Sequence, residues 1–102
     1  MGTVSDTAGL VAYQAGAVVS RTIIARKSGT VTLFSFDRNE GLSEHTAPYD
    51  ALVHVLEGEA EITINGVPSN LTAGQMIIMP ASKPHALKAL SPFKMMLIMV
   101  HE

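Results

Sequence analysis

A chain of 102 residues has room for one domain, and 47% hydrophobic against 16% charged residues is too apolar for a disordered chain. The net charge is −2, the seven basic residues are scattered and aromatic residues make up only 5%, so nucleic acid is not expected as a partner. With no cysteine, the chain has no disulfide, no thiolate metal ligand and no cysteine nucleophile.

Residues 1–16 are small and mixed in character, and we expect an N-terminal arm that lies across the outside of the fold. They show no secretory signal, and every apolar run in the chain is shorter than ten residues, too short to span a membrane. A cytoplasmic protein that does not contact membranes is therefore the expectation. Residues 17–102 are expected to form one domain.

Residues 17–26 and 31–37 are rich in Val, Ile, Thr and Phe, which favours two strands. Residues 50–56 are apolar on both faces, which is unusual for a strand that has one side in water. The face that carries Leu52, His54 and Leu56 needs a cover, and we expect a homodimer formed through it.

Residues 59–64 alternate apolar and polar, and Asn65-Gly66 is typical of a type I′ hairpin turn into residues 67–71. Three more strands are predicted at 75–79, 85–89 and 93–101, and a short extended segment at 43–45 brings the total to about nine. No segment has the pattern of an amphipathic helix. Short strands at this spacing predict an all-β sandwich or barrel.

Two stretches resemble the cupins, a superfamily of small β-barrels of the jelly-roll (double-stranded β-helix) kind. The second cupin motif, G-x5-P-x-G-x2-H-x3-N, matches through Gly74, Pro80 and His85. The first, G-x5-H-x-H-x3-E-x6-G, matches through His45 and Gly58. The resemblance implies a small single-domain cupin in which the two histidines meet at the barrel mouth.

The chain departs from the motifs at several positions. Ala47 stands in place of the second histidine and Ala51 in place of the glutamate. In metal-binding cupins, three histidines and this glutamate hold the ion, so only His45 and His85 are left of the four. A divalent zinc, iron, manganese or nickel ion on these two would need a third ligand, for which Asp37, Tyr49, His101 or a methionine are the alternatives.

Three functions follow as hypotheses. In the first, the barrel binds a small molecule, for sensing, carrying or sequestering, in a largely apolar pocket whose polar groups are His45 and His85. Tyr49, Met79 and Met99 are the other candidates for its lining, although core packing is the ordinary role of methionines. In the second, the chain is a metal-dependent cupin enzyme of the dioxygenase, isomerase or decarboxylase type, with a divalent ion on the two histidines. A barrel with a purely interaction role is a third alternative.

Overall fold

The structure of the chain is a computed structural model that describes residues 2–101, and it is almost entirely β. Nine strands follow a single 3₁₀ turn, η1 (Thr7–Leu10). The strands are β1 (Val18–Arg26), β2 (Gly29–Phe36), β3 (Gly41–His45), β4 (Asp50–Glu57), β5 (Glu59–Ile64), β6 (Val67–Thr72), β7 (Met76–Met79), β8 (His85–Ala89) and β9 (Phe93–Val100). The predicted all-β class is confirmed. No helix within residues 2–101 is long and apolar enough to cross a membrane.

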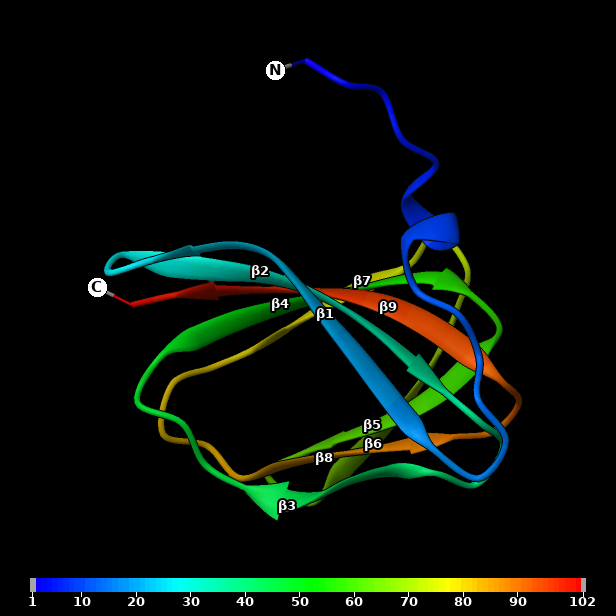
Figure 1. Cartoon of the computed structure of the whole chain (residues 1–102). Helices are drawn as coiled ribbons and strands as arrows, with labels where there is room; N and C mark the ends of the chain where they lie inside the picture. The colour runs from blue at the N-terminus through cyan, green and yellow to red at the C-terminus, as the bar shows by residue number, and fades with distance from the viewer. Residues whose placement is uncertain (1, 102) are drawn as a thin grey trace.

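Two antiparallel sheets form the body of the molecule and face each other (Figure 1). The five-stranded sheet has the order β1-β2-β9-β4-β7, and the four-stranded sheet has the order β3-β8-β5-β6. The chain passes between the sheets at Gly58, whose φ of +82° is unfavourable for other residues. Asn65 and Gly66 both have positive φ, as the type I′ hairpin turn between β5 and β6 requires.

The core lies between the sheets and is built from the inward face of each strand. On β4 the inward residues Ala51, Val53 and Val55 are at most 4% exposed, and β5 and β8 contribute alternate residues in the same way. Phe36 and Phe93 stack at its centre with ring centroids 4.5 Å apart. Both faces of the five-stranded sheet are partly apolar, and the core uses only the inner one.

Two positions where the cupin motifs have glycine are occupied here by other residues that adopt a left-handed backbone. Asn39 has a φ of +68° and Ser82 a φ of +64°. Asparagine tolerates this region because its short side chain can hydrogen-bond locally, and serine occupies it at a larger steric cost. Both positions therefore have a backbone conformation that favours glycine although no glycine stands there.

The N-terminal arm crosses the outer face of the five-stranded sheet at one end. Its main-chain carbonyls accept hydrogen bonds from three strands: Leu10 from Arg21 on β1, Ala12 from the Ser35 hydroxyl on β2, and Ala8 from the Lys94 ammonium on β9. These three hydrogen bonds tie the segment to the outside of the sheet.

One buried lysine, Lys94, connects the arm to β9. The Nζ atom of Lys94 lies 2.7 Å from the Ala8 carbonyl oxygen, 3.6 Å from the Glu57 carboxylate and 4.9 Å from the centre of the Tyr13 ring. The Tyr13 hydroxyl in turn donates to Glu57 at 2.7 Å. Burial and the neighbouring Glu57 carboxylate raise the pKa of the Tyr13 phenol above its ordinary value. Nothing in the sequence pattern pointed to this arrangement.

Candidate functional site

The two motif histidines lie side by side at one end of the barrel. His45 ends β3, His85 begins β8, and the two are paired in register, so their side chains project from the same face of the sheet. Their rings meet edge to face with centroids 4.3 Å apart, and the two Nε2 atoms are 3.1 Å apart. Forty residues separate them in the sequence, and the pairing of β3 with β8 brings them together.

Each imidazole is oriented by a carbonyl oxygen two residues earlier in the chain. Nδ1 of His45 lies 2.7 Å from the Ser43 oxygen, and Nδ1 of His85 lies 3.2 Å from the Lys83 oxygen. A carbonyl oxygen only accepts, so Nδ1 of His45 carries its proton. Sequence reasoning missed these carbonyls, because main-chain groups leave no signal in residue types.

One proton is needed between the facing nitrogens. Both Nδ1 atoms face carbonyl oxygens, which only accept, so two neutral rings that donate there would turn unprotonated Nε2 atoms toward each other. The shared proton therefore requires either that one ring gives up its Nδ1 hydrogen bond or that the pair carries one positive charge. With that proton in place, one Nε2 atom donates and the other accepts.

The protein environment favours the neutral form of His85. Its ring is buried, with 5% of the residue exposed, whereas His45 is exposed. Burial, followed by the charge of His45, lowers the pKa of His85. A neutral imidazole at His85 suits hydrogen bonding to a polar group.

Methionines line the opposite wall at the same end of the barrel. Ala51 on β4 is paired with Met99 on one side and Met79 on the other, and Ala51 and Met79 are buried inward. The connections 46–49 and 80–84 join His45 to the start of β4 and the end of β7 to His85, which places this row across from the histidines (Figure 1). The buried state of Met79, 3% exposed, agrees with a packing role.

The other candidates make contacts with other residues. Tyr49 packs its ring on His101, with centroids 4.3 Å apart. Both carboxylate oxygens of Asp37 accept main-chain amides, from Gly16 and Arg38, and these bonds lower its pKa. The structure thus shows other partners for three of the residues that were alternatives for a third metal ligand.

The donor set around the pair is too small for the family's metal site. The two missing ligand positions carry Ala47 and Ala51, and Ala51 is 4% exposed with its side chain in the core. Within residues 2–101, no group of three or more His, Asp or Glu side chains could hold an ion. Catalytic zinc sites commonly have three protein ligands. The residues present do not fit a four-ligand metal site.

Comparison with known proteins identifies the family. The family model described as "Cupin domain" matches residues 32–101, which is more than half of the chain. The chain belongs to the cupin superfamily. The resemblance of the two motifs is thereby confirmed, and the two facing sheets are those of the cupin jelly roll. No functionally curated protein matches the chain.

Three solved structures are closely similar. A conserved protein of unknown function from Streptococcus pyogenes is 37% identical, with a TM-score of 0.95, covering 100% of this chain and 90% of that one. A cupin superfamily protein from Desulfitobacterium hafniense is 28% identical, with a TM-score of 0.94 and coverage of 100% and 94%. A cupin 2 conserved barrel domain protein from Leptotrichia buccalis is 40% identical, with a TM-score of 0.89, covering 91% of this chain and 45% of that one. None of these descriptions names an activity.

Proposed function

We propose that this cupin binds a small molecule at the barrel mouth, with His45 and His85 as the polar groups that orient it. The observation that carries the proposal is the 3.1 Å contact between the two Nε2 atoms. Binding sites typically combine an apolar lining with a few convergent polar groups. At this end of the barrel Met99 is half-buried, and the buried Met79 and Ala51 make the interior behind it apolar.

The donor–acceptor character of the pair suggests which ligand group it would hold. A hydroxyl group can accept from one Nε2 atom and donate to the other, and so replace the hydrogen bond between the rings. Neither a group that only donates nor one that only accepts replaces it completely. A compact molecule with an apolar body and a hydroxyl group is the class that fits best.

A co-purification experiment tests this proposal. Untagged protein is analysed by native mass spectrometry, and small molecules released by heating are identified by untargeted mass spectrometry. We expect a bound species in the wild type and its loss in His45→Ala and His85→Ala. His54→Ala is the matched control, because His54 is paired with Met76 on β7 and Met96 on β9 and projects from the outer face of the sheet. A bound species that survives in both pair variants would contradict the proposal.

A metal-dependent cupin enzyme, of the dioxygenase, isomerase or decarboxylase type, is the second candidate. One observation favours it: each Nδ1 faces a carbonyl oxygen, as the second nitrogen of a metal-ligating histidine commonly does. The 3.1 Å between the Nε2 atoms is also close to the separation of about 3.3 Å between two nitrogens bound to one tetrahedral zinc ion. A divalent ion held by two imidazoles would need its other ligands from water or from the bound molecule.

Metal titration separates the two candidates. Chelator-treated protein is titrated with Zn²⁺, Ni²⁺, Mn²⁺ or Fe²⁺ under anaerobic conditions, and heat release is measured. Stoichiometric binding that is lost in His45→Ala and His85→Ala but retained in His54→Ala favours the enzyme. Binding no stronger in the wild type than in the pair variants favours the metal-free pocket.

A further inference from the structure

Two ring-bearing side chains stand just beyond the row of methionines on the five-stranded sheet. Strand register pairs Ala51 of β4 with Met99 of β9, and two residues further on along each strand stand Tyr49 and His101. Their ring centroids are 4.3 Å apart and the ring planes are inclined by 32°. The His101 amide donates to the Ser28 carbonyl at 2.8 Å, so the backbone of His101 is held beside β2. We call Tyr49 and His101 the ring pair.

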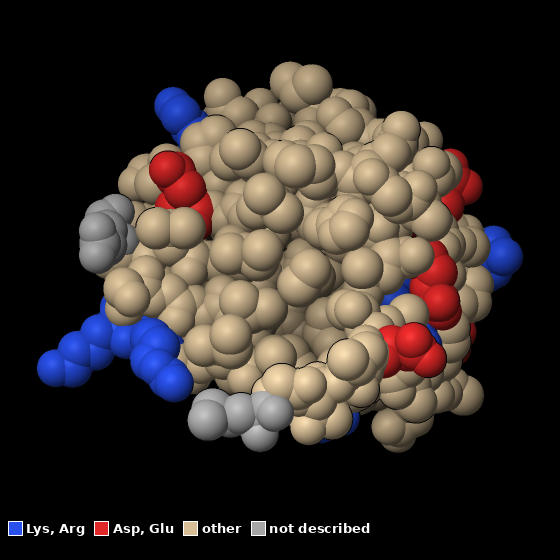
Figure 2. Space-filling view, turned by 90° about the horizontal axis from the view of Figure 1, so that it is seen from above, with Lys and Arg blue, Asp and Glu red and all other residues tan. Residues whose placement is uncertain are grey.

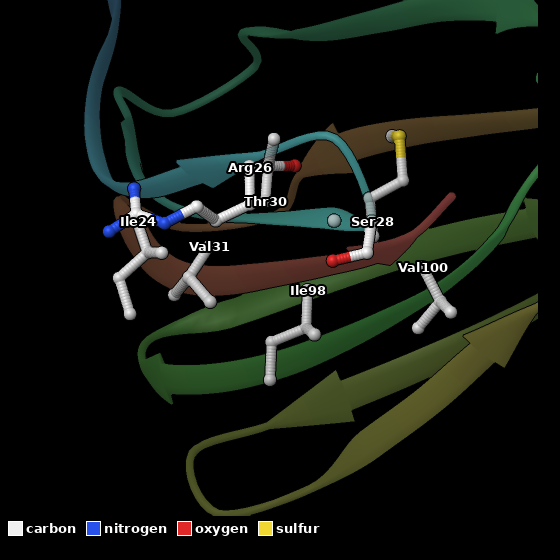
Figure 3. Close-up of a pocket in the computed structure, with 9 residues that line it drawn as sticks. Ile24, Arg26, Ser28, Thr30, Val31, Ile98 and Val100 are labelled. Atoms are coloured by element: carbon white, nitrogen blue, oxygen red, sulfur yellow. The ribbon is translucent and has the colours of Figure 1, made fainter. Parts of the chain in front are cut away.

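The ring pair lies on the inner side of the sheet. Side chains alternate between the two faces along a strand, so Tyr49 shares the face of Ala51, which is buried in the core. The close-up shows Val100 pointing to one side of the sheet and Thr30 to the other (Figure 3). His101 follows Val100 and therefore points to the side of Thr30. Because the two rings are in contact, both assignments describe the same face.

The histidine pair stands on the other sheet at the same end of the barrel. Tyr49 follows His45 by four residues, so their Cα atoms are at most about 14 Å apart. Two connections cross from one sheet to the other at this end (Figure 1). Facing sheets pack about 10 Å apart. The opening thus has the imidazoles of His45 and His85 on one side and the ring pair on the other.

Hydrogen bonds between the two connections fix the distance across the opening. The Ser82 amide donates to the Ala47 carbonyl at 2.7 Å. The Ala81 amide donates to the Asp50 carboxylate, also at 2.7 Å, and Asp50 is the residue directly after Tyr49. These bonds tie the segment that carries Tyr49 to the segment that leads into β8. The two pairs of rings are therefore held on a common frame.

The residues around the opening can be reached by a ligand. His45 is exposed, and Tyr49, His101 and Met99 are half-buried. Ala51, 4% exposed, lies deeper on the same sheet and closes the core. A molecule at this end of the barrel would therefore rest on an apolar floor between the two pairs of rings, without entering the core.

We propose that the ring pair selects the body of the ligand and that the ligand is a small phenol. The inference rests on the proposed function, in which the ligand hydroxyl lies between the Nε2 atoms of His45 and His85. Aromatic rings prefer offset-stacked or edge-to-face contacts with one another, which a saturated ring does not make. His101 covers one face of the Tyr49 ring, so the ligand ring would contact its other face or its edge.

The outer face of the five-stranded sheet is the competing place for an apolar ligand. It is a broad surface whose centre has no charged side chains (Figure 2). Two hollows lie on this face, and none of the described residues that line them is aromatic. Stacking on an aromatic side chain is therefore not available there. Ile78, which lines one of the hollows and is 54% exposed, is the position for a control variant.

NMR titration of the full chain with phenol and with cyclohexanol tests the inference. The two probes have the same ring size and one hydroxyl group each, but only phenol is flat and aromatic. In the wild type, the dissociation constant of phenol should be roughly two- to tenfold lower than that of cyclohexanol. Phenol should also shift the side-chain signals of Tyr49 and His101. Both probes should bind more weakly to His45→Ala and His85→Ala.

Three variants separate stacking from general apolar contact. Tyr49→Leu keeps an apolar side chain without the ring, so the preference for phenol should disappear while cyclohexanol still binds. Tyr49→Phe restores the ring and should restore the preference. Ile78→Ser, the control on the outer face, should bind both probes like the wild type. Circular dichroism checks that each variant is folded. If Tyr49→Leu unfolds, the shifts of Tyr49 and His101 in the wild type decide.

The outcomes distinguish the ring pair from the histidine pair. Equal affinities for the two probes, with shifts at His45 and His85, would overturn the inference and leave the proposed function standing. A preference for phenol that persists in both histidine variants would support the ring pair and contradict the proposed function. Binding of phenol without a shift at Tyr49, or binding that is lost in Ile78→Ser, would overturn the inference, as would no binding of phenol.

Discussion

Replacing Lys94 by methionine should loosen the N-terminal arm. The lysine side chain is only 11% exposed, and its ammonium donates to the Ala8 carbonyl at 2.7 Å. A hydrogen bond from a charged group contributes about 1.5–3 kcal/mol to stability. The Glu57 carboxylate at 3.6 Å is 42% exposed, so that ion pair adds at most about 1 kcal/mol. The Tyr13 ring at 4.9 Å adds about 0.5–1 kcal/mol.

Together these contacts contribute about 2–5 kcal/mol, against which stands the cost of burying the ammonium. Methionine keeps most of the aliphatic volume and avoids that cost. We therefore expect Lys94→Met to lower the free energy of unfolding by about 1–3 kcal/mol. Urea denaturation followed by circular dichroism measures this change. Lys88→Met, at an exposed position on β8, is the control and should stay within about 0.5 kcal/mol of the wild type.

Hydrogen exchange tells a local loosening of the arm from a general loss of stability. In Lys94→Met the amides of η1, including that of Gly9, should exchange faster, since the arm loses its contact with β9. The Gly16 amide should change less, because it donates separately to the Asp37 carboxylate at 2.7 Å. Unchanged exchange in η1 together with unchanged stability would refute the role of Lys94 in holding the arm on β9.

Three further outcomes are expected. In urea denaturation, Gly58→Ala should lower the free energy of unfolding by about 1–2 kcal/mol more than Gly66→Ala. Both glycines have φ near +80°, but a Cβ at Gly58 would lie 2.7 Å from Phe93 Cα, whereas a Cβ at Gly66 meets nothing within 4 Å. Equal losses of stability would refute this reasoning. The pKa of His85 is lowered in the folded state, so the free energy of unfolding should be unaffected above about pH 6.5 and decline as the pH falls below that value. In pH-dependent denaturation, His85→Gln should reduce this decline. A wild type that becomes more stable on acidification would contradict the expected direction. The pKa of Tyr13 is raised, so its phenolate absorbance at 295 nm should develop above about pH 10, and stability should fall as the pH rises above that value. Titration of Tyr13 at the ordinary value would argue against it.

The sequence by itself determined the fold and most strand positions. Alternation in residues 59–64, the Asn65-Gly66 turn and the absence of helical periodicity are local signals, and each was realised in the structure. The motif spacing also predicted that His45 and His85 would meet, since a conserved barrel fixes which strands are neighbours. The apolar outer face of β4 could be seen in residues 50–56, although only for that one strand.

Only the tertiary structure decided the geometry of the site and the extent of the outer face. The 3.1 Å contact, the carbonyls that orient the rings and the lowered pKa of His85 depend on atoms that residue types do not place. The apolar residues on the outer face of the five-stranded sheet, such as Ile24 and Ile78, became visible as neighbours only when strand register joined five separate strands. The hydrogen bond from Lys94 to the Ala8 carbonyl likewise joins residues that are 86 positions apart in the chain. Contacts between distant segments follow from the packing of the whole chain, and local patterns do not encode them one by one.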